Sequence, residues 1–178
     1  MKTRATELQG CYVIELEPKR DERGFFARSF CKEELANTGI HMDIVQANWS
    51  HNVNRGTVRG MHFQREPYGE PKIVCCVRGS MFDVFVDLRP DSATYLRSVS
   101  VELDAQQLNA VYLPEGIAHG FQTLTDDVLV QYWMGAPYMA NAASGIRHDD
   151  PSVEIRWPLP VRALSERDRT WPLLERPT

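Results

Sequence analysis

Several features that define other classes of protein are missing from this chain of 178 residues. No apolar run approaches the roughly 20 residues that a membrane-spanning helix needs. The first ten residues, MKTRATELQG, hold no apolar stretch of the kind that a secretory signal requires. The formal net charge is -4, which argues against a general nucleic-acid binder. These absences predict a cytoplasmic protein with neither a membrane nor a nucleic acid among its partners.

Cysteine is also scarce. The four cysteines are Cys11, Cys31, Cys75 and Cys76. None of them are spaced as CxxC, and the adjacent pair lies in an apolar, strand-like run. Buried reduced thiols are therefore favoured over a disulfide or a metal role.

A metal site is not expected either. Metal sites in β-barrels commonly use an HxH pair, but here His62 is followed by Phe63 and Gln64. Two well-separated histidines, His62 and His119, fall short of a ligand set for iron, manganese or zinc. No Gly-rich phosphate loop or nucleotide-binding fold is visible, so we expect no metal and no cofactor.

What the chain does contain is alternation of apolar and polar residues with a period of two. In residues 81–88, Asp83, Phe85 and Asp87 alternate with four apolar side chains. Similar short runs, separated by turn formers, cover residues 12–16, 44–48, 58–64, 73–78, 99–103, 110–113, 119–124 and 128–134. Helical signal is confined to residues 32–38 and to a capping box at residues 165–168. The pattern predicts an all-β sandwich or barrel, with a few short helices, forming one domain over residues 1–178.

Candidate acid–base residues lie around His62. Lys72 opens the next run ten residues later, so we expect the two strands to lie side by side and to present His62 and Lys72 together. Strict alternation places Arg59 and His62 on opposite faces. Either a bulge at Gly60 brings both inward, or Arg59 serves another site.

Charge is distributed unevenly. Residues 51–80 hold five basic side chains (Arg55, Arg59, Arg65, Lys72 and Arg78) against two acidic ones (Glu66 and Glu70). This local excess favours a small anionic ligand, the alternative being an ordinary solvated face. Asp83, on an otherwise apolar strand, needs a partner if it is buried. Asp168 is either a helix cap or a functional carboxylate.

These residues belong to a series of motifs in a specific order. They are DERGFF at 21–26, VQANWS at 45–50, VRGMHFQ at 58–64, GSMFDVFVDLR at 79–89, LPEGIAHGF at 113–121, DDP at 149–151, IRWP at 155–158 and LSERD at 164–168. In this order and spacing the chain resembles the dTDP-4-dehydrorhamnose 3,5-epimerase family. The resemblance runs from residue 21 to residue 168.

The resemblance implies a cupin double-stranded β-helix, a jelly-roll barrel, that acts as a metal-independent homodimer on a nucleotide-diphosphate sugar. The implied reaction inverts C3 and C5 of a 4-keto-6-deoxyhexose in deoxysugar biosynthesis. His62 would be the general base, with Asp168 holding its imidazole in one tautomer. Lys72 would stabilise the enolate oxygen, and Tyr132 would deliver a proton from the opposite face of the ring.

The resemblance also implies how the substrate is bound. Arg59 would contact the diphosphate, Arg23 would reach from the N-terminal segment into the neighbouring subunit's site, and Phe26 would stack on the base. The other implied substrate-binding residues are Gln46, Asn48, His119 and Tyr138, with Asp83 supporting the pocket from behind.

One position departs from the family. Arg28 stands where the family commonly has a glutamate whose carboxylate accepts the N3–H of thymine, and arginine can only donate. Arg28 would instead suit CDP or a further phosphate contact, unless it points to solvent. A C3-only epimerase, a non-catalytic nucleotide-sugar-binding cupin and a metal-dependent cupin remain the alternatives.

Overall fold

The computed structural model describes residues 1–174; the last four residues of the predicted domain, 175–178, lie outside this part. The described strands are β1 (Lys2–Ala5), β2 (Tyr12–Glu15), β3 (Lys19–Asp21), β4 (Gly24–Phe26), β5 (Gln46–Asn52), β6 (Val58–Gln64), β7 (Lys72–Arg78), β8 (Ser80–Asp87), β9 (Ser98–Asp104), β10 (Asn109–Leu113), β11 (Ile117–Thr123), β12 (Val128–Met134) and β13 (Ala143–Gly145). The described helices are α1 (Lys32–Ala36) and α2 (Glu166–Thr170). None of the helices in residues 1–174 is long and apolar enough to cross a membrane.

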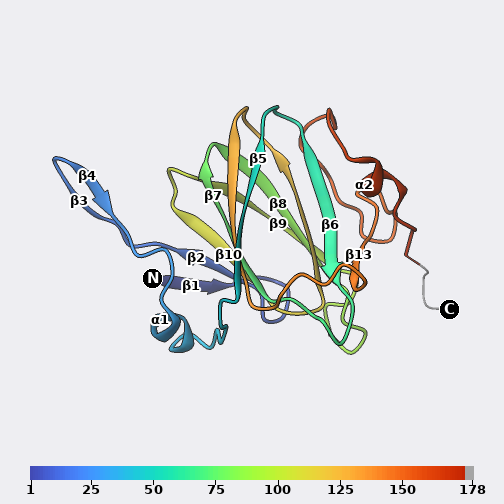
Figure 1. The fold of residues 1–178 in the computed structure, drawn as a ribbon, viewed down its shortest axis with the longest axis horizontal. Coiled ribbons are helices and arrows are strands. Elements are labelled where there is room, and N and C mark those ends of the chain that lie inside the picture. Colours follow the sequence, from blue (N-terminus) through green and yellow to red (C-terminus); the bar gives the residue numbers. More distant parts are fainter. Residues whose placement is uncertain (175–178) are drawn as a thin grey trace.

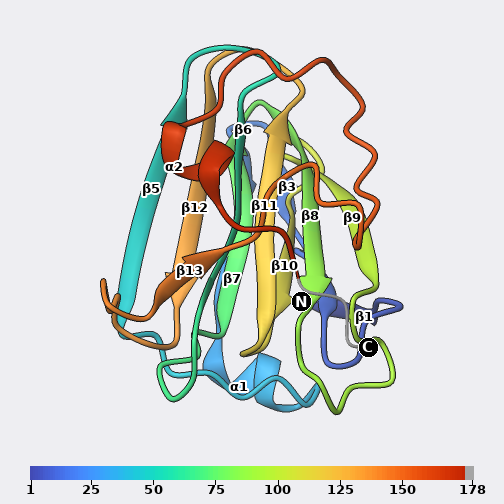
Figure 2. The same ribbon diagram turned by 90° about the vertical axis from the view of Figure 1, so that its right-hand side faces the viewer.

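The strands form two sheets that face each other (Figures 1 and 2). The six-stranded sheet has the order β1-β2-β10-β7-β12-β5, and the five-stranded sheet has the order β13-β6-β11-β8-β9. Strands β3 and β4 form a separate hairpin that projects from the body in Figure 1. Neighbouring strands run antiparallel, and most neighbours within the two sheets come from distant parts of the chain, as in a jelly roll. The predicted all-β cupin barrel is confirmed.

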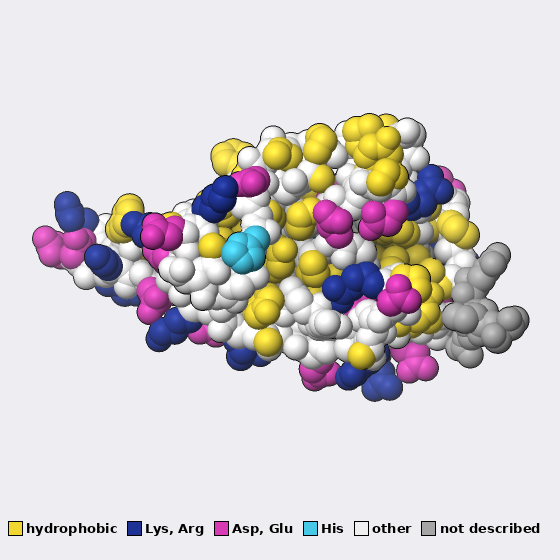
Figure 3. All heavy atoms as spheres, turned by 90° about the horizontal axis from the view of Figure 1, so that it is seen from below, with side chains coloured by type: hydrophobic (Ala, Val, Ile, Leu, Met, Phe, Trp, Pro, Cys, Tyr) yellow, Lys and Arg dark blue, Asp and Glu magenta, His cyan; other side chains and the backbone are white. Residues whose placement is uncertain are grey.

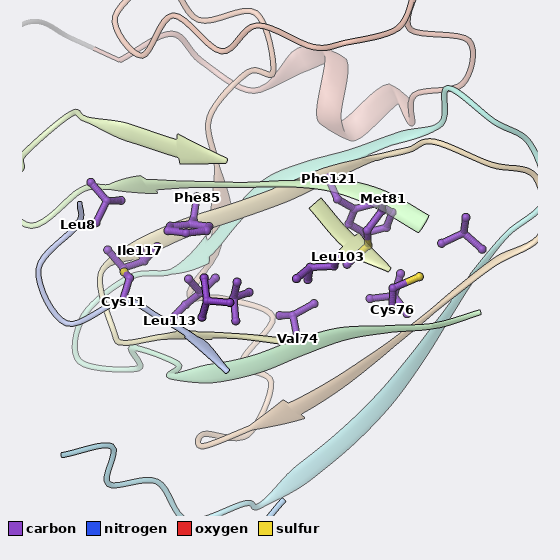
Figure 4. Close-up of a cluster of buried hydrophobic side chains, with 14 residues drawn as sticks. Leu8, Cys11, Val74, Cys76, Met81, Phe85, Leu103, Leu113, Ile117 and Phe121 are labelled. Carbon is purple, nitrogen blue, oxygen red and sulfur yellow. The ribbon is translucent and has the colours of Figure 1, made fainter. Parts of the chain in front are cut away.

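Alternation along the strands builds the core. On β8, Phe85 points between the sheets into a cluster that Figure 4 shows, while Val84 and Val86 belong to a second cluster on the outer face. The chain after β13 covers that outer face and contributes Val153 to its cluster. Both faces of β8 are therefore buried, as its nearly continuous apolar sequence requires.

Most predicted strands match the structure to within one or two residues at each end, but one extends well beyond its predicted end. The run expected at residues 44–48 is β5, which extends from Gln46 to Asn52. As an edge strand, β5 is held by its backbone ladder to β12. Its polar second half therefore forms a strand without the apolar alternation that the prediction relied on.

The expected pairing of the strands that carry His62 and Lys72 is wrong. His62 lies on β6 in the five-stranded sheet, whereas Lys72 begins β7 in the six-stranded sheet. Lys72 is instead paired with Leu113 on β10 and Met134 on β12. Two strands that follow each other in the sequence need not pair as a hairpin in a jelly roll, because the chain can cross from one sheet to the other between them.

Gly60 creates an irregularity in β6. The register with β11 runs His119 to His62 and then Phe121 to Arg59, so two residues of β6 lie opposite one of β11. Gly60 has φ +119°, and a Cβ there would lie 2.5 Å from the Cα of Gly120. Only glycine fits this bulge without displacing the neighbouring strand.

We therefore expect Gly60→Ala to lower the free energy of unfolding by roughly 2–5 kcal/mol, the sum of left-handed backbone strain and steric overlap. The matched control is Gly39→Ala. Gly39 also has a positive φ, +87°, but its Cβ would meet nothing within 4 Å. That variant should lose only about 1 kcal/mol. Urea unfolding measures both, and equal losses would contradict this role of Gly60.

Candidate active site

A cavity of about 300 Å³ lies between the sheets and is lined from both of them. Its size suits a small-molecule site. Eight of the predicted site residues line it: Gln46, Asn48, Arg59, His62, Lys72, His119, Tyr132 and Tyr138. Arg59 and His62 therefore serve the same site and not two different ones, because the bulge at Gly60 lets both side chains face this cavity.

His62 and Asp168 form a hydrogen-bonded pair at this cavity. His62 Nε2 lies 2.6 Å from Asp168 Oδ1, and the Gly60 N–H donates to the other carboxylate oxygen over 3.2 Å. The Asp168 side chain is 4% exposed, whereas that of His62 is 44% exposed. The imidazole thus reaches the cavity while its carboxylate partner is shielded.

Asp168 is placed by α2. Its backbone N–H donates to Ser165 Oγ over 3.0 Å, so Ser165 is the N-cap as predicted. The Asp168 carboxylate, however, is directed to His62 and Gly60 on β6 and does not complete a capping box. Burial raises the pKa of Asp168, but the hydrogen bond and charge of His62, with the Gly60 N–H, outweigh it and leave that pKa below its ordinary value. The carboxylate is therefore ionised at neutral pH.

Behind the cavity, His119 Nε2 lies 2.7 Å from Asp83 Oδ1, so Asp83 has the partner that its burial required. Its other oxygen, Oδ2, is buried without a hydrogen-bond partner in residues 1–174. Burial raises the pKa of Asp83 above its ordinary value, and the charges of His119 and Lys72 oppose this only in part. Asp83 thus does not line the cavity itself but contacts His119, which does.

Tyr132 lies against this pair. Its ring meets the His119 ring edge-on, with centroids 6.0 Å apart. Burial and the charge of Asp83 raise the pKa of Tyr132 above its ordinary value, although Arg59 opposes the shift. The phenol therefore keeps its proton at neutral pH and is suited to donate it.

The polar groups at the mouth of the cavity are also held in place. Arg59 Nε donates to the buried Asn52 Oδ1 over 2.6 Å, and Gln46 Nε2 donates to Asn48 Oδ1 over 3.1 Å. Gln46 Oε1 in turn accepts from the backbone N–H of Tyr138 over 3.2 Å. Arg59 is thereby oriented in advance for an anionic group.

Three predicted site residues lie away from this cavity. Arg23 and Phe26 belong to the β3–β4 hairpin, where Arg23 pairs with Asp21 and Phe26 is 71% exposed. Figure 3 shows Lys/Arg and Asp/Glu side chains crowding the tip of this projection. Arg28 follows the hairpin and bonds to Glu34. In the described part of one chain, none of these three residues lines the cavity of His62.

The five basic side chains of residues 51–80 are likewise divided between the cavity and the surface. Only Arg59 and Lys72 line the cavity. Arg55 and Arg65 donate to backbone carbonyls at the surface, and Arg78 pairs with Asp127 there. The anionic-ligand prediction therefore depends on two of the five basic residues.

Sequence reasoning missed several residues that line the cavity. They are Trp49, Ser50, Phe63, Gln64, Glu70, Phe121, Met134, Ala143, Ser144 and Arg167. Glu70 bonds to Lys72, with Oε1 2.6 Å from Nζ. Its position two residues before Lys72 is the signal that identifies it, since alternate residues of an extended chain share a face. Arg167 adjoins Asp168 on α2, and no pattern pointed to it.

The four cysteines are reduced, as predicted, but only two of them are buried. Cys11 and Cys76 are buried and Cys31 and Cys75 are half-buried; all four are free thiols. Across residues 1–174, no group of three or more His, Cys, Asp or Glu side chains is arranged to hold a metal ion. His62 and His119 face each other in the register of β6 and β11, yet each is paired with its own carboxylate.

Known proteins resemble this chain over almost its whole length. A family model described as dTDP-4-dehydrorhamnose 3,5-epimerase matches residues 5–176. The enzyme of that name from Methanothermobacter thermautotrophicus is 43% identical over 177 residues, which covers 97% of this chain and 94% of that protein. A dTDP-4-dehydrorhamnose 3-epimerase from Streptomyces niveus is 39% identical over 170 residues, covering 95% of this chain and 82% of that protein.

The fold agrees with these matches. The crystal structure of dTDP-4-dehydrorhamnose 3,5-epimerase from Bacillus anthracis, with TDP and PPi bound, is similar with a TM-score of 0.95 and 36% identity, covering 97% of this chain and 99% of that chain. The sequence motifs, the jelly roll and the paired residues of the cavity agree with this similarity. The chain belongs to the dTDP-4-dehydrorhamnose 3,5-epimerase family.

Proposed function

We propose that this chain is an isomerase that inverts C3 and C5 of dTDP-4-keto-6-deoxyglucose, giving dTDP-4-dehydrorhamnose for deoxysugar biosynthesis. The observation that carries the proposal is the cavity shared by His62, Lys72 and Tyr132. His62 comes from one sheet and Tyr132 from the other, so the two can meet a sugar ring from different sides.

His62 removes the first proton. The C4 ketone acidifies the C–H bonds at C3 and C5, because loss of either proton places negative charge on the ketone oxygen. Asp168 accepts from Nε2 of His62, which leaves Nδ1 of the imidazole to take the proton. The ionised carboxylate then stabilises the imidazolium that forms.

Lys72 and Tyr132 complete the inversion. The Lys72 ammonium donates to the developing enolate oxygen, a contribution that typically accounts for roughly 10²–10³ in rate. The protonated Tyr132 phenol then delivers a proton to the opposite face of the same carbon. His62 then releases its proton to solvent and Tyr132 regains one from solvent, after which the same two steps at the other carbon beside the ketone invert the second centre.

Deuterium exchange separates the two proton-transfer residues. In D₂O, His62→Ala should slow deuterium entry at both C3 and C5 by roughly 10²–10⁴-fold, because no base removes the proton. Tyr132→Phe should still exchange deuterium into the substrate, while inverted product falls by roughly 10²-fold. NMR of the sugar measures exchange and inversion together.

The matched control is Tyr68→Phe, an exposed tyrosine outside the cavity, which should leave both rates unchanged. Deuterium at C3 alone would make this a 3-epimerase, like the Streptomyces niveus relative. Exchange at the wild-type rate in His62→Ala would remove His62 as the base. A wild-type protein that exchanges no 4-keto sugar would be the non-catalytic binder.

We further propose a homodimer in which the β3–β4 hairpin reaches the neighbouring subunit's site. The hairpin stands away from its own barrel, with Phe26 71% and Phe25 53% exposed. Such apolar exposure on a projection favours burial against a partner. Phe25 also lines a cavity of about 390 Å³ with Val77 and Trp133, on the outer face of the six-stranded sheet. A second copy would cover this face and receive Arg23 and Phe26 beside its nucleotide.

Mixing two inactive variants tests this arrangement. Phe26→Ala lacks the stacking ring but keeps the base, and His62→Ala lacks the base but keeps the hairpin. If the hairpin acts across the dimer, an equimolar random mixture should contain intact sites amounting to about one quarter of the total, and should recover about that share of wild-type activity. A mixture that shows only the summed activities of the two parents would place the hairpin in its own subunit's site.

The nucleotide is proposed to be dTDP, with CDP as the alternative that Arg28 raises. Arg28 bonds to Glu34, and both line a cavity of about 240 Å³ with Phe26 and Lys19. Glu34 thus supplies a carboxylate beside Phe26 where the family's glutamate is replaced, and it can accept the N3–H of thymine.

Calorimetry should therefore show dTDP binding at least about ten times more tightly than CDP, the difference expected from one hydrogen bond to a charged group. Glu34→Gln should lose most of this preference. Equal or tighter binding of CDP by the wild-type protein would instead assign base recognition to the Arg28 donors.

A further inference from the structure

The Glu70 carboxylate is a feature of the cavity that the proposed mechanism leaves unused. Its side chain is 11% exposed, and its Oε1 accepts over 2.6 Å from the Lys72 ammonium, whose side chain is 4% exposed. Within residues 1–174, its second oxygen, Oε2, has no hydrogen-bond partner, and the side chain lines the cavity. Oε2 is not fully buried but open to the cavity, where the hydroxyl of a bound ligand can donate to it in place of water.

The Glu70–Lys72 pair presents two complementary functions side by side. Lys72 only donates hydrogen bonds and an ionised Glu70 only accepts them. A ketone with a hydroxyl on the adjacent carbon has the opposite arrangement, an acceptor beside a donor. If Lys72 holds the C4 oxygen, the donor within reach of Glu70 is the hydroxyl on a carbon next to C4.

The other neighbour of Lys72 is apolar. Met134 on β12 is directly paired with Lys72 on β7, is 7% exposed, and also lines the cavity. The two carbons that flank the ketone of a 4-keto-6-deoxy sugar differ in the same way, since C3 carries a hydroxyl and C5 carries a methyl group. A carboxylate and a thioether beside one ammonium therefore distinguish the two edges of the ring.

We propose that Glu70 is a specificity-determining residue that accepts a hydrogen bond from the C3 hydroxyl of the substrate. The inference rests on the proposed function and adds to it a requirement for a hydroxyl beside the ketone. Glu70 thereby fixes which ring edge faces β7 while Lys72 holds the ketone oxygen.

A purely structural role would have a different signature. Glu70 also holds the Lys72 ammonium, so its removal disturbs enolate stabilisation with any 4-keto sugar. That effect is independent of the C3 hydroxyl. A contact with the hydroxyl, in contrast, is lost only for substrates that possess one, and a comparison of two substrates separates the contributions.

The test measures kcat/KM for deuterium uptake at the carbons flanking the ketone, with dTDP-4-keto-6-deoxyglucose and with its 3-deoxy analogue. Glu70→Ala should lower the value for the hydroxylated substrate by at least about 10-fold more than the value for the analogue, as expected for a hydrogen bond to a charged group. Glu70→Gln retains an acceptor oxygen and should recover part of this difference. Glu66→Gln, an exposed carboxylate on the same loop, is the matched control and should leave both values unchanged.

Equal losses on the two substrates would overturn the proposal and confine Glu70 to holding Lys72. No loss on either would overturn it as well. If Glu70→Ala does not fold, the wild-type protein and Glu70→Gln decide, because a wild-type protein indifferent to the C3 hydroxyl contradicts the contact. Absence of uptake by the wild-type protein on both substrates would instead refute the proposed function itself, and this inference with it.

Discussion

The hydrogen bond between His62 and Asp168 is the interaction on which the rest of the site depends. It joins residues 106 positions apart in the chain, and it forms only when the segment after β13 has crossed the outer face of the five-stranded sheet. The same carboxylate accepts from the backbone of Gly60, at the bulge that turns Arg59 into the cavity. One carboxylate thus connects the closing segment, the bulge and the imidazole.

A second constraint is the pairing of charge in a shielded space. Three carboxylates lie at or behind the cavity, and each contacts a basic side chain: Asp168 with His62, Asp83 with His119, and Glu70 with Lys72. Burying a carboxylate without such a partner is prohibitively unfavourable. Burial raises the pKa values of Asp83 and Tyr132, whereas at Asp168 the hydrogen bond and charge of His62 outweigh burial and lower the pKa. A base and a proton donor can therefore coexist in one cavity at the same pH.

The two-sheet architecture explains how these groups approach a ligand from different directions. The strand with His62 and the strands with Lys72 and Tyr132 belong to opposite sheets, so a ring between the sheets has protein on both faces. The β3–β4 hairpin takes no part in either sheet. Because the hairpin projects from the barrel, it suits the proposed role beside a second copy, where it would supply contacts that the cavity lacks.

The sequence by itself determined the class of fold, most strand positions, the N-cap at Ser165 and, through the spacing of its motifs, the family. These features depend on local periodicity or on residue order, and both can be read along the chain. The tertiary structure decided what depends on non-local register. It placed His62 and Lys72 in opposite sheets, turned Arg59 inward at Gly60, paired Asp83 with His119, and brought Glu70 and Arg167 to the cavity. Sequence periodicity could not supply this, because a jelly roll pairs strands distant in sequence and a one-residue bulge reverses the face on which side chains lie.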